Sequence, residues 1–426
     1  MLVCSIYKGE MQKQKFKQTE IGMIPEDWEV KPIKEFVKIN ELTINKNFQF
    51  NDIEYIDIDS VDNGIIKNSQ SLKLKDAPSR AKRIVRKNDV IISTVRPNLK
   101  HFAFIKEAKP NTIVSTGFAV ISSKHIDPKF LYYFITTDKY TNYLTAIADS
   151  HTSTYPSFNP DVIENSLLSY PNEDEQSAIA KILSDLDSKI ELNQQMNKIL
   201  EAIGQAIFKH WFIDFEFPNE KGKPYKNSGG EMVDSELGKI PKWWEVNELG
   251  EFIEFVKGRK PNQVFGNDED GLMPQILIDV LDGGTPFFSN SENMVQSDET
   301  DIIMVMDGAS SGRTERGFAG ILGSTLAKIK VKELNQDYVY CLLKIKEDDI
   351  KQNTTGTSIP HADKKKIEKY LIAVPPKKIL EDFRINFNQI LFRQILIRKE
   401  NKNLSQIRDS LLPKLMSGKI RVYNEK

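Results

Sequence analysis

An internal repeat limits what this chain can fold into more than any other feature of its sequence. The stretch EIGMIPEDWEV (residues 20–30) returns in the second half as ELGKIPKWWEV (residues 236–246). Glycine and proline shape turns, and a tryptophan beside them can pack on a core. The shared motif GxIPxxW therefore predicts a turn that leads into a strand, and its two copies mark the beginnings of two equivalent units.

The two units match beyond their first residues. Three further pairs of segments align: 88–97 with 300–309, 114–121 with 323–329, and 163–171 with 367–375. The offset between the copies changes along the unit, which indicates that the interior loops differ in length. Solenoid repeats recur every roughly 20–50 residues. A much longer period predicts two duplicated domains in a pseudo-twofold molecule.

Short runs of β-branched and aromatic residues fill the first unit. Four of them, bounded by Asn, Asp, Gly or Pro, predict strands at 55–59, 90–95, 101–105 and 112–121. The segment 127–148 predicts one helix, because its aromatic residues recur near helical spacing and Asp127 precedes a proline. Segment 337–350 is its counterpart in the second unit. Each unit is therefore expected to be a mixed α/β globule.

The hydrophobic period changes after Pro171. Apolar residues recur every three and four positions from 179 to 211 and again, in matching register, from 383 to 415. Each run predicts a helix of about 40 residues, on the order of 60 Å long, that cannot cover its apolar stripe alone. We expect the two helices to pair antiparallel. Asn197 and Asn401 share one seam position, where a buried amide fixes register or an amide is simply tolerated at a wet seam.

These patterns predict an α+β protein in which two pseudo-twofold-related globular domains of mixed α/β structure are separated by two long antiparallel coiled-coil helices. The predicted boundaries are 18–170 for domain one, 171–216 for helical spacer one, 217–232 for a linker, 233–374 for domain two and 375–422 for helical spacer two.

Composition limits the class of protein. Charged residues make up 28% of the chain and the net charge is -1, so the whole molecule is not a general polyanion binder. No apolar run approaches the roughly 18 residues of a membrane span, and the first residues lack the features of a secretory signal. Cys4 and Cys341 are the only cysteines and offer neither a disulfide framework nor a metal site. A cytoplasmic protein is expected.

Motifs of catalysis are missing from the sequence. No NPPF or DPPY stretch of a base-flipping methyltransferase and no GxxxxGK[ST] phosphate loop occur. Asn159 and Pro160 in SFNPDV lack the following aromatic residue and read as a turn. Asp57 and Asp59 alternate along a predicted strand, as residues on a solvated face do. We expect no catalytic residue and no metal site.

Two further stretches resemble a known family. IFKHWFIDFEFP (207–218) and IRDSLLPKLMSGKI (407–420), together with the repeated GxIPxxW, resemble the specificity subunit of type I restriction-modification systems over almost the whole chain. The resemblance implies two target recognition domains that each read half of a bipartite site in double-stranded DNA, with the helices as spacer and docking surface. It implies no catalysis and no cofactor in this chain. Two modification subunits would use S-adenosylmethionine to methylate adenine N6, and ATP- and Mg-dependent restriction subunits would join them.

Specific DNA contact requires cations for phosphates and forked or amide donors for base edges. The candidates in domain one are Arg80, Lys82, Arg83, Arg86, Arg96, Asn98 and Lys100, and those in domain two are Arg259, Lys260, Ser311, Arg313 and Arg316. Charge on a protected strand edge or in a flexible surface loop would explain the same residues.

Two runs of hydroxyl residues align between the units. SHTSTYP (150–156) and TTGTSIP (354–360) each end at a proline before a long helix, so Thr152, Ser153, Thr357 and Ser358 are candidates for phosphate contact. A shared turn geometry would explain the alignment equally well. Two other functions remain open from the sequence: a coiled-coil adaptor whose domains bind proteins, and a self-contained restriction-methylation enzyme.

Overall fold

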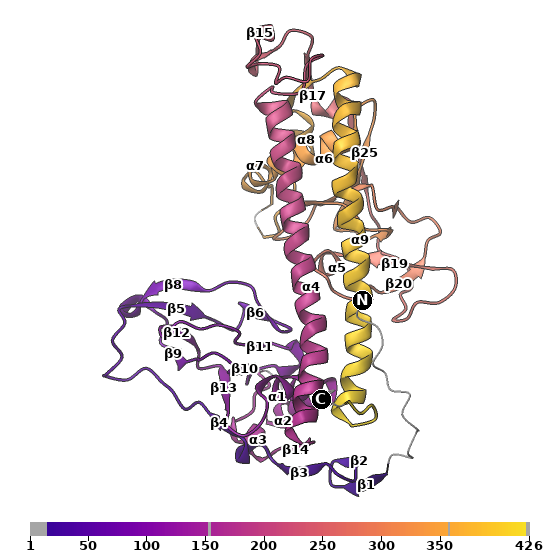
Figure 1. Cartoon of the computed structure of the whole chain (residues 1–426). Helices are drawn as coiled ribbons and strands as arrows, with labels where there is room; N and C mark the ends of the chain where they lie inside the picture. The colour runs from indigo at the N-terminus through magenta and orange to yellow at the C-terminus, as the bar shows by residue number, and fades with distance from the viewer. Residues whose placement is uncertain (1–14, 152–154, 357, 423–426) are drawn as a thin grey trace. The chain divides into compact units, whose positions relative to one another are not determined.

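The computed structural model describes residues 15–151, 155–356 and 358–422. The chain divides into two compact units (Figure 1). Unit 1 comprises Met1–Ile190 and Asn403–Lys426, and unit 2 comprises Glu191–Lys402. Each long helix therefore contributes one part of its length to each unit.

Unit 1 contains fourteen of the named strands and the shorter helices of the first half. Its strands are β1 Phe16–Thr19, β2 Gly22–Pro25, β3 Glu29–Pro32, β4 Val37–Ile39, β5 Asp52–Ile56, β6 Val61–Asp62, β7 Ile65–Ile66, β8 Gln70–Lys73, β9 Ala81–Ile84, β10 Val90–Ser93, β11 Phe102–Phe104, β12 Thr112–Ser115, β13 Phe118–Ser123 and β14 Leu167–Tyr170. Its helices are η1 Ile33–Glu35, η2 Leu74–Asp76, η3 Pro97–Leu99, α1 Pro128–Ile135, α2 Asp138–His151 and α3 Asp161–Asn165.

Unit 2 repeats this order. Its strands are β15 Met232–Ser235, β16 Gly238–Pro241, β17 Glu245–Glu248, β18 Ile253–Lys257, β19 Leu272–Ile276, β20 Phe288–Asn290, β21 Gln296–Ser297, β22 Ile302–Val305, β23 Thr314–Glu315, β24 Gly320–Leu322, β25 Leu326–Val331 and β26 Leu371–Val374. Its shorter helices are η4 Lys209–Ile213, η5 Leu249–Glu251, α5 Ile278–Leu281, α6 Gln336–Ile345, α7 Glu347–Gln352 and α8 Lys364–Glu368.

The sheets of the two units have the same topology. Unit 1 holds sheets β11-β10-β13-β4 and β8-β5-β12-β9, and unit 2 holds sheets β23-β22-β25-β18 and β20-β19-β24-β21. In each unit a single pair, β5 with β12 or β19 with β24, is parallel among otherwise antiparallel neighbours. The strands that the sequence alignment matched, β10 with β22 and β13 with β25, occupy the same positions. The duplicated α+β fold is confirmed.

The long helices are α4 Glu173–Phe208 and α9 Lys377–Met416. Asn172 begins α4 by accepting a hydrogen bond from the Glu175 N–H, and acidic residues fill the first turn, where the helix dipole favours negative charge. The helices pair antiparallel. In unit 1 Arg408 lies 2.9 Å from Asp187, and in unit 2 Asn193 donates to Asn401 at 2.8 Å. The seam amide pair is thus Asn193 with Asn401, not two equivalent residues.

The single helix predicted at 127–148 is wrong, because the structure contains α1 and α2 there. The hydroxyl of Thr136 donates to the Tyr132 carbonyl and that of Thr137 to the Phe134 carbonyl. Such side-chain bonds compete with the helical backbone pattern. The counterpart at 337–350 is likewise divided between α6 and α7.

In each unit the tryptophan of the repeated motif contacts residues at or beyond the ends of the long helices. We call this contact region the junction, and its chemistry differs between the two units. In unit 1 the buried Trp28 donates to Glu175 at 3.3 Å, and Arg421 binds both Glu175 and Asp27. Gly418, at φ +66°, has no room for a side chain, because a Cβ there would lie 2.4 Å from Pro25 and 3.3 Å from Trp28. In unit 2 the stacked rings of Phe217 and Trp244 lie 5.4 Å apart, with Phe215 at their edge. The first junction is ionic and the second is aromatic.

Candidate nucleic-acid interface

A loop at the end of β10 in unit 1 is joined to the segment that follows α2. The Arg96 N–H donates to the Pro156 carbonyl at 2.8 Å, and the Phe158 N–H donates to the Thr94 carbonyl at 3.0 Å. Val95 and Ser157 form an isolated β-bridge between these two bonds. This arrangement, which we call the tip frame of unit 1, brings the basic loop 94–101 and the end of the hydroxyl run together.

Unit 2 contains the same frame at the end of β22. The Gly308 N–H donates to the Pro360 carbonyl at 2.9 Å, the Ala362 N–H donates to the Met306 carbonyl at 2.8 Å, and Asp307 and His361 form the bridge. Every bond of the frame joins main-chain atoms. The two motifs that the sequence identified separately, the loop after the strand and the hydroxyl run, therefore form one substructure in each unit.

The candidate residues of unit 1 do not form one patch. Arg80 and Arg96 flank the turn between β12 and β13 at one edge of unit 1, because the Thr116 N–H donates to the Arg80 carbonyl and the Thr94 hydroxyl donates to the Gly117 carbonyl. Asn98 is exposed in η3, and Lys100 is paired with Asp138 at 2.7 Å. This edge, with its tip frame, presents cations to solvent.

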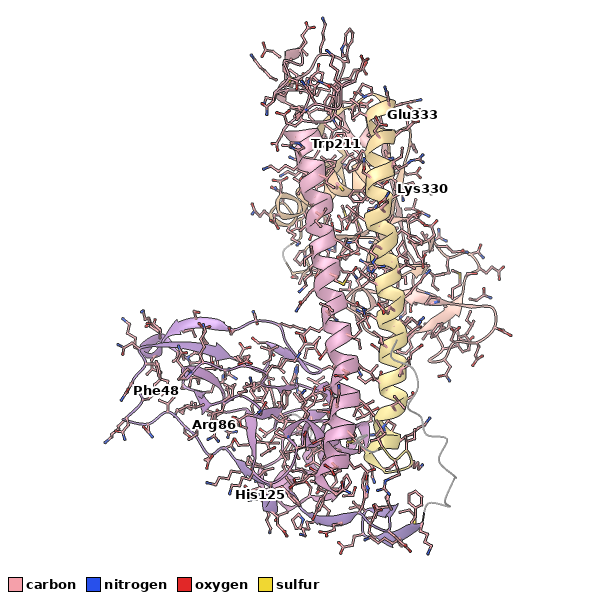
Figure 2. All side chains as sticks on the ribbon, viewed as in Figure 1. Phe48, Arg86, His125, Trp211, Lys330 and Glu333 are labelled. Carbon is pink, nitrogen blue, oxygen red and sulfur yellow. The ribbon has the colours of Figure 1, made fainter. Side chains whose placement is uncertain are left out.

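The other unit 1 candidates lie along or beyond β9. Lys82 is exposed, whereas Arg83 is half-buried and burial lowers its pKa. Arg86, labelled in Figure 2, sits in the turn before β10, at the opposite end of that strand from Arg96. It is paired with Glu41 at 2.7 Å. The run of basic residues in the sequence is thus divided between two ends of the sheet.

In unit 2, Arg259 and Lys260 are exposed after β18, and Ser358 is exposed beside the tip frame. Ser311 is buried, at 2% exposure, which removes it from the candidates for DNA contact. Thr152, Ser153 and Thr357 lie outside the described residues, so their roles stay predictions.

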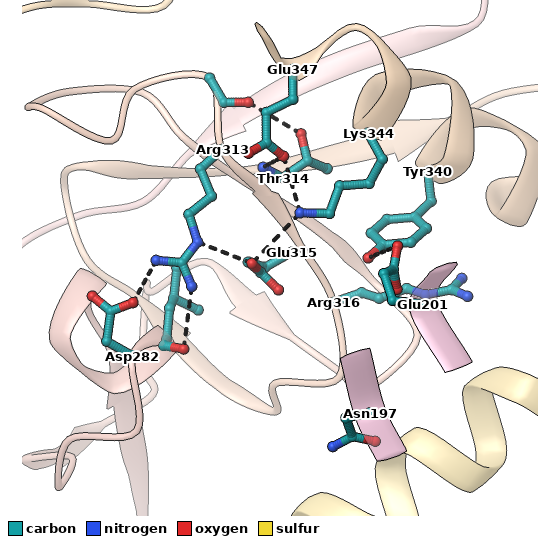
Figure 3. A network of polar contacts seen from close by, with 12 residues as sticks. Asn197, Glu201, Asp282, Arg313, Thr314, Glu315, Arg316, Tyr340, Lys344 and Glu347 are labelled. Carbon is teal, nitrogen blue, oxygen red and sulfur yellow. Dashed lines mark hydrogen bonds and ion pairs between the residues drawn. The ribbon is translucent and has the colours of Figure 1, made fainter. Parts of the chain in front are cut away.

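Two arginine candidates of unit 2 serve the fold in this structure. The Arg313 guanidinium binds Asp282 at 2.6 Å and Glu315 at 2.9 Å (Figure 3). Burial alone would lower the pKa of Arg313, but these bonds outweigh it and raise the pKa. Arg316 is 2% exposed and pairs with Asp337 at 2.7 Å. Their prediction as DNA contacts is corrected, because Arg316 is buried and the Arg313 guanidinium, on a side chain that is 22% exposed, is held by two acids.

The sequence search missed three residues at the tip of unit 2. His361 Nδ1 lies 2.7 Å from Asp307, and Lys257 lies 2.9 Å from the other oxygen of that carboxylate. Burial would raise the pKa of Asp307, but the bonds from His361 and Lys257 outweigh it and hold the pKa low. The run Lys364–Lys366 follows directly and is exposed. The available signal was the KKK triplet that begins four residues after the aligned Pro360.

One protein family matches a segment in each half of the chain. Residues 25–202 and 241–397 match the family described as "Type I restriction modification DNA specificity domain". The chain belongs to this specificity family. Its function is DNA sequence recognition within a type I restriction-modification system.

Similar proteins span the chain nearly end to end. The MjaIX specificity subunit of Methanocaldococcus jannaschii is 30% identical over 96% of each chain. The HindI specificity subunit of Haemophilus influenzae is 25% identical over 88% of this chain and 97% of its own. A solved S subunit from M. genitalium has the same fold, with a TM-score of 0.53 and 16% identity over 94% of this chain and 96% of that one.

Within 15–151, 155–356 and 358–422, no group of three or more His, Cys, Asp or Glu side chains could hold a metal ion. Among the helices of that same part of the chain, none is both long and apolar enough to cross a membrane.

Proposed function

We propose that this chain is the non-catalytic, DNA-reading subunit of its complex, with the tip frame of each unit at the centre of one half-site contact. The observation that carries the proposal is the construction of one frame twice from main-chain bonds, Arg96 to Pro156 and Gly308 to Pro360. A duplicated frame with different side chains suits two half-sites of different sequence. The paired helices α4 and α9 would set the gap between them.

Local charge supports this placement. The chain carries a net charge of -1, so attraction to phosphates has to come from particular surfaces. Arg80 and Arg96 are exposed at the tip edge of unit 1. Lys257, His361 and Lys364 gather at the tip of unit 2, where Lys364 lies over the Phe255 ring. Arg80 and the lysines would contact the DNA backbone, and the frame side chains, Arg96 among them, would meet base edges.

Apolar side chains on the outer faces of the helices in unit 2 favour docking of modification subunits. Leu192, Ile199 and Ile203 form a stripe on α4, and Ile385, Phe392 and Leu396 form one on α9, all of them exposed. Both stripes have spacings of seven and four residues, which keep the side chains on one helix face. Two modification subunits would cover such surfaces and supply the S-adenosylmethionine chemistry, while restriction subunits would supply the ATP- and Mg-dependent chemistry.

The proposal predicts a split methylation motif that depends on this chain. Genomic DNA from cells carrying the chain and its modification subunit would be sequenced by single-molecule long reads, with and without the chain. We expect adenine methylation at two short sequences separated by a fixed gap, lost when the chain is deleted. Methylation that is unchanged by the deletion would contradict the proposal and favour an adaptor role.

The docking surface predicts a specific assembly defect. Changing Ile199 and Phe392 together to glutamate should weaken binding of the modification subunit by at least about tenfold, roughly 1.4 kcal/mol, because charge replaces apolar contact area. Both side chains are exposed, so the fold should be retained. Mass photometry of mixed subunits measures the effect, with the exposed Lys198→Glu as the control. Equal assembly of both variants would place the docking surface elsewhere.

A further inference from the structure

We infer that Arg96 reads a guanine in the half-site of unit 1, through the major-groove edge of the base. The inference rests on the proposed function and assigns a base to one of its two frames. The two frames differ at one equivalent backbone position, which is Arg96 in unit 1 and Gly308 in unit 2.

The backbone of Arg96 is strained. Arg96 has φ +48° and ψ +61°, in the left-handed region that residues with a Cβ avoid. In unit 2 the residue that makes the same frame bond is Gly308, at φ +105°, where glycine is comfortable. The frame itself therefore suits glycine. An arginine there costs stability in unit 1, and strain of this kind is retained where a side chain has a function.

The side chain of Arg96 is exposed and is oriented by a neighbouring aromatic ring. Its guanidinium carbon lies 4.8 Å from the centroid of the Tyr155 ring, and both residues are exposed. Among the described residues, no carboxylate forms an ion pair with Arg96. Arg86, Arg313 and Arg316, by contrast, are each bound to an acid. Arg96 is thus exposed, its guanidinium lies against the Tyr155 ring, and no described carboxylate pairs with its N–H donors.

This combination fits a base better than a phosphate. The guanidinium fork matches the O6 and N7 acceptors of guanine, which is the commonest specific contact in the major groove. Stacking on a ring fixes the plane of the guanidinium, whereas a phosphate accepts a cation from many directions. An arginine lying on a tyrosine is therefore oriented for bidentate hydrogen bonds to one base edge.

The frame of unit 2 lacks both side chains that the guanine contact requires. Gly308 has no side chain to reach a base, and the residue aligned with Tyr155 is Ile359, which is 56% exposed. An apolar side chain cannot form hydrogen bonds with guanine. We therefore expect the guanine contact in only one of the two half-sites.

The test is the methylation motif of cells that carry Arg96→Ala, Arg96→Lys or Arg96→Gly in the full chain with its modification subunit. We expect one guanine of one half-site to become degenerate, with at least about tenfold more methylation at the other three bases. The other half-site and the gap should stay unchanged. Lys75→Ala, which removes an exposed cation of η2, is the control and should leave the motif intact.

Stability gives a second measurement on the same variants. Arg96→Gly should raise the melting temperature of the chain by roughly 2–4 °C, because it relieves the left-handed strain, while it relaxes the motif. A residue with a purely structural role would not improve stability and lose base discrimination together. Arg96→Lys keeps the charge and the strain, so it should relax the motif without that gain.

Three results would overturn the inference. The first is a uniform fall in methylation at all sites without relaxed bases, as expected of a phosphate contact. The second is an unchanged motif in all three variants. In both cases the split motif of the unmodified chain still stands, so the proposed function survives. The third, no split motif with the unmodified chain, would overturn the proposed function and this inference together.

Discussion

Replacing Asp337 with alanine is expected to lower the free energy of unfolding of unit 2 by about 3–5 kcal/mol. Asp337 lies in the first turn of α6 and its carboxylate pairs with Arg316 at 2.7 Å. Arg316 lies between the rings of Tyr340 and Phe387, with its guanidinium carbon 4.2 and 4.5 Å from their centroids. Removing the acid leaves a buried cation whose charge nothing balances, and that desolvation cost is the source of the effect.

Urea unfolding of the full-length chain, followed by circular dichroism, measures this change. The matched control is Asp348→Ala, which removes an exposed acid from the first turn of α7 and should cost less than about 0.5 kcal/mol. The double variant Arg316→Met with Asp337→Leu should recover most of the loss, since an apolar pair replaces the ion pair. A single Asp337→Ala variant as stable as the control would show that the ring contacts alone hold Arg316.

Replacing Arg421 with methionine should destabilise unit 1 by a similar amount, about 3–5 kcal/mol. The Glu175 side chain is fully buried, and Arg421 approaches it at 2.6 Å and 2.7 Å while it also binds Asp27. Among the described side chains, Trp28 would then be the one left donating to that buried carboxylate. The hydrogen bonds that the Arg421 guanidinium donates to Glu175 raise the pKa of Arg421, because the charged form makes them.

Tryptophan fluorescence follows the unfolding, in which Trp28 reports on unit 1 and Trp211, Trp243 and Trp244 report on unit 2. The repeat also indicates which pair of substitutions should restore the lost stability. Residues Ile379 and Phe217 of unit 2 align with Glu175 and Arg421, and there they pack around Trp244 and its neighbours. Arg421→Phe combined with Glu175→Ile should therefore restore stability that either change alone removes. A double variant less stable than both single variants would mean that the two junctions are not interchangeable.

The repeat in the sequence is enough to predict a duplicated α+β fold with paired helices, because residues such as Trp28, Pro25 and Gly22 reappear in order. It also identifies the hydroxyl runs and the basic loop of unit 1. What the sequence does not show is that these two segments meet. Their contact is made by main-chain bonds, which carry no side-chain signature.

The errors in the arginine candidates have a similar origin. Arg313 and Arg316 stand in a loop rich in glycine and serine, as exposed residues often do. Arg313 also pairs with the neighbouring Glu315, but Asp282 and Asp337 lie more than twenty positions from their arginines and are brought close only by the fold. Helix α1 ends early because two threonine hydroxyls bind its last carbonyls, and a periodic pattern does not reveal such a competition.

The tip frames have a consequence for how these proteins acquire new targets. Each frame is held by peptide N–H and carbonyl groups, which every residue except proline can supply in full. Substitutions at Arg96, Tyr155 or Ile359 therefore leave the supporting bonds intact. Under the proposed function, a lineage would alter the DNA sequence it recognises through a few single-residue steps, each of which keeps a folded protein, while the helices and junctions stay unchanged.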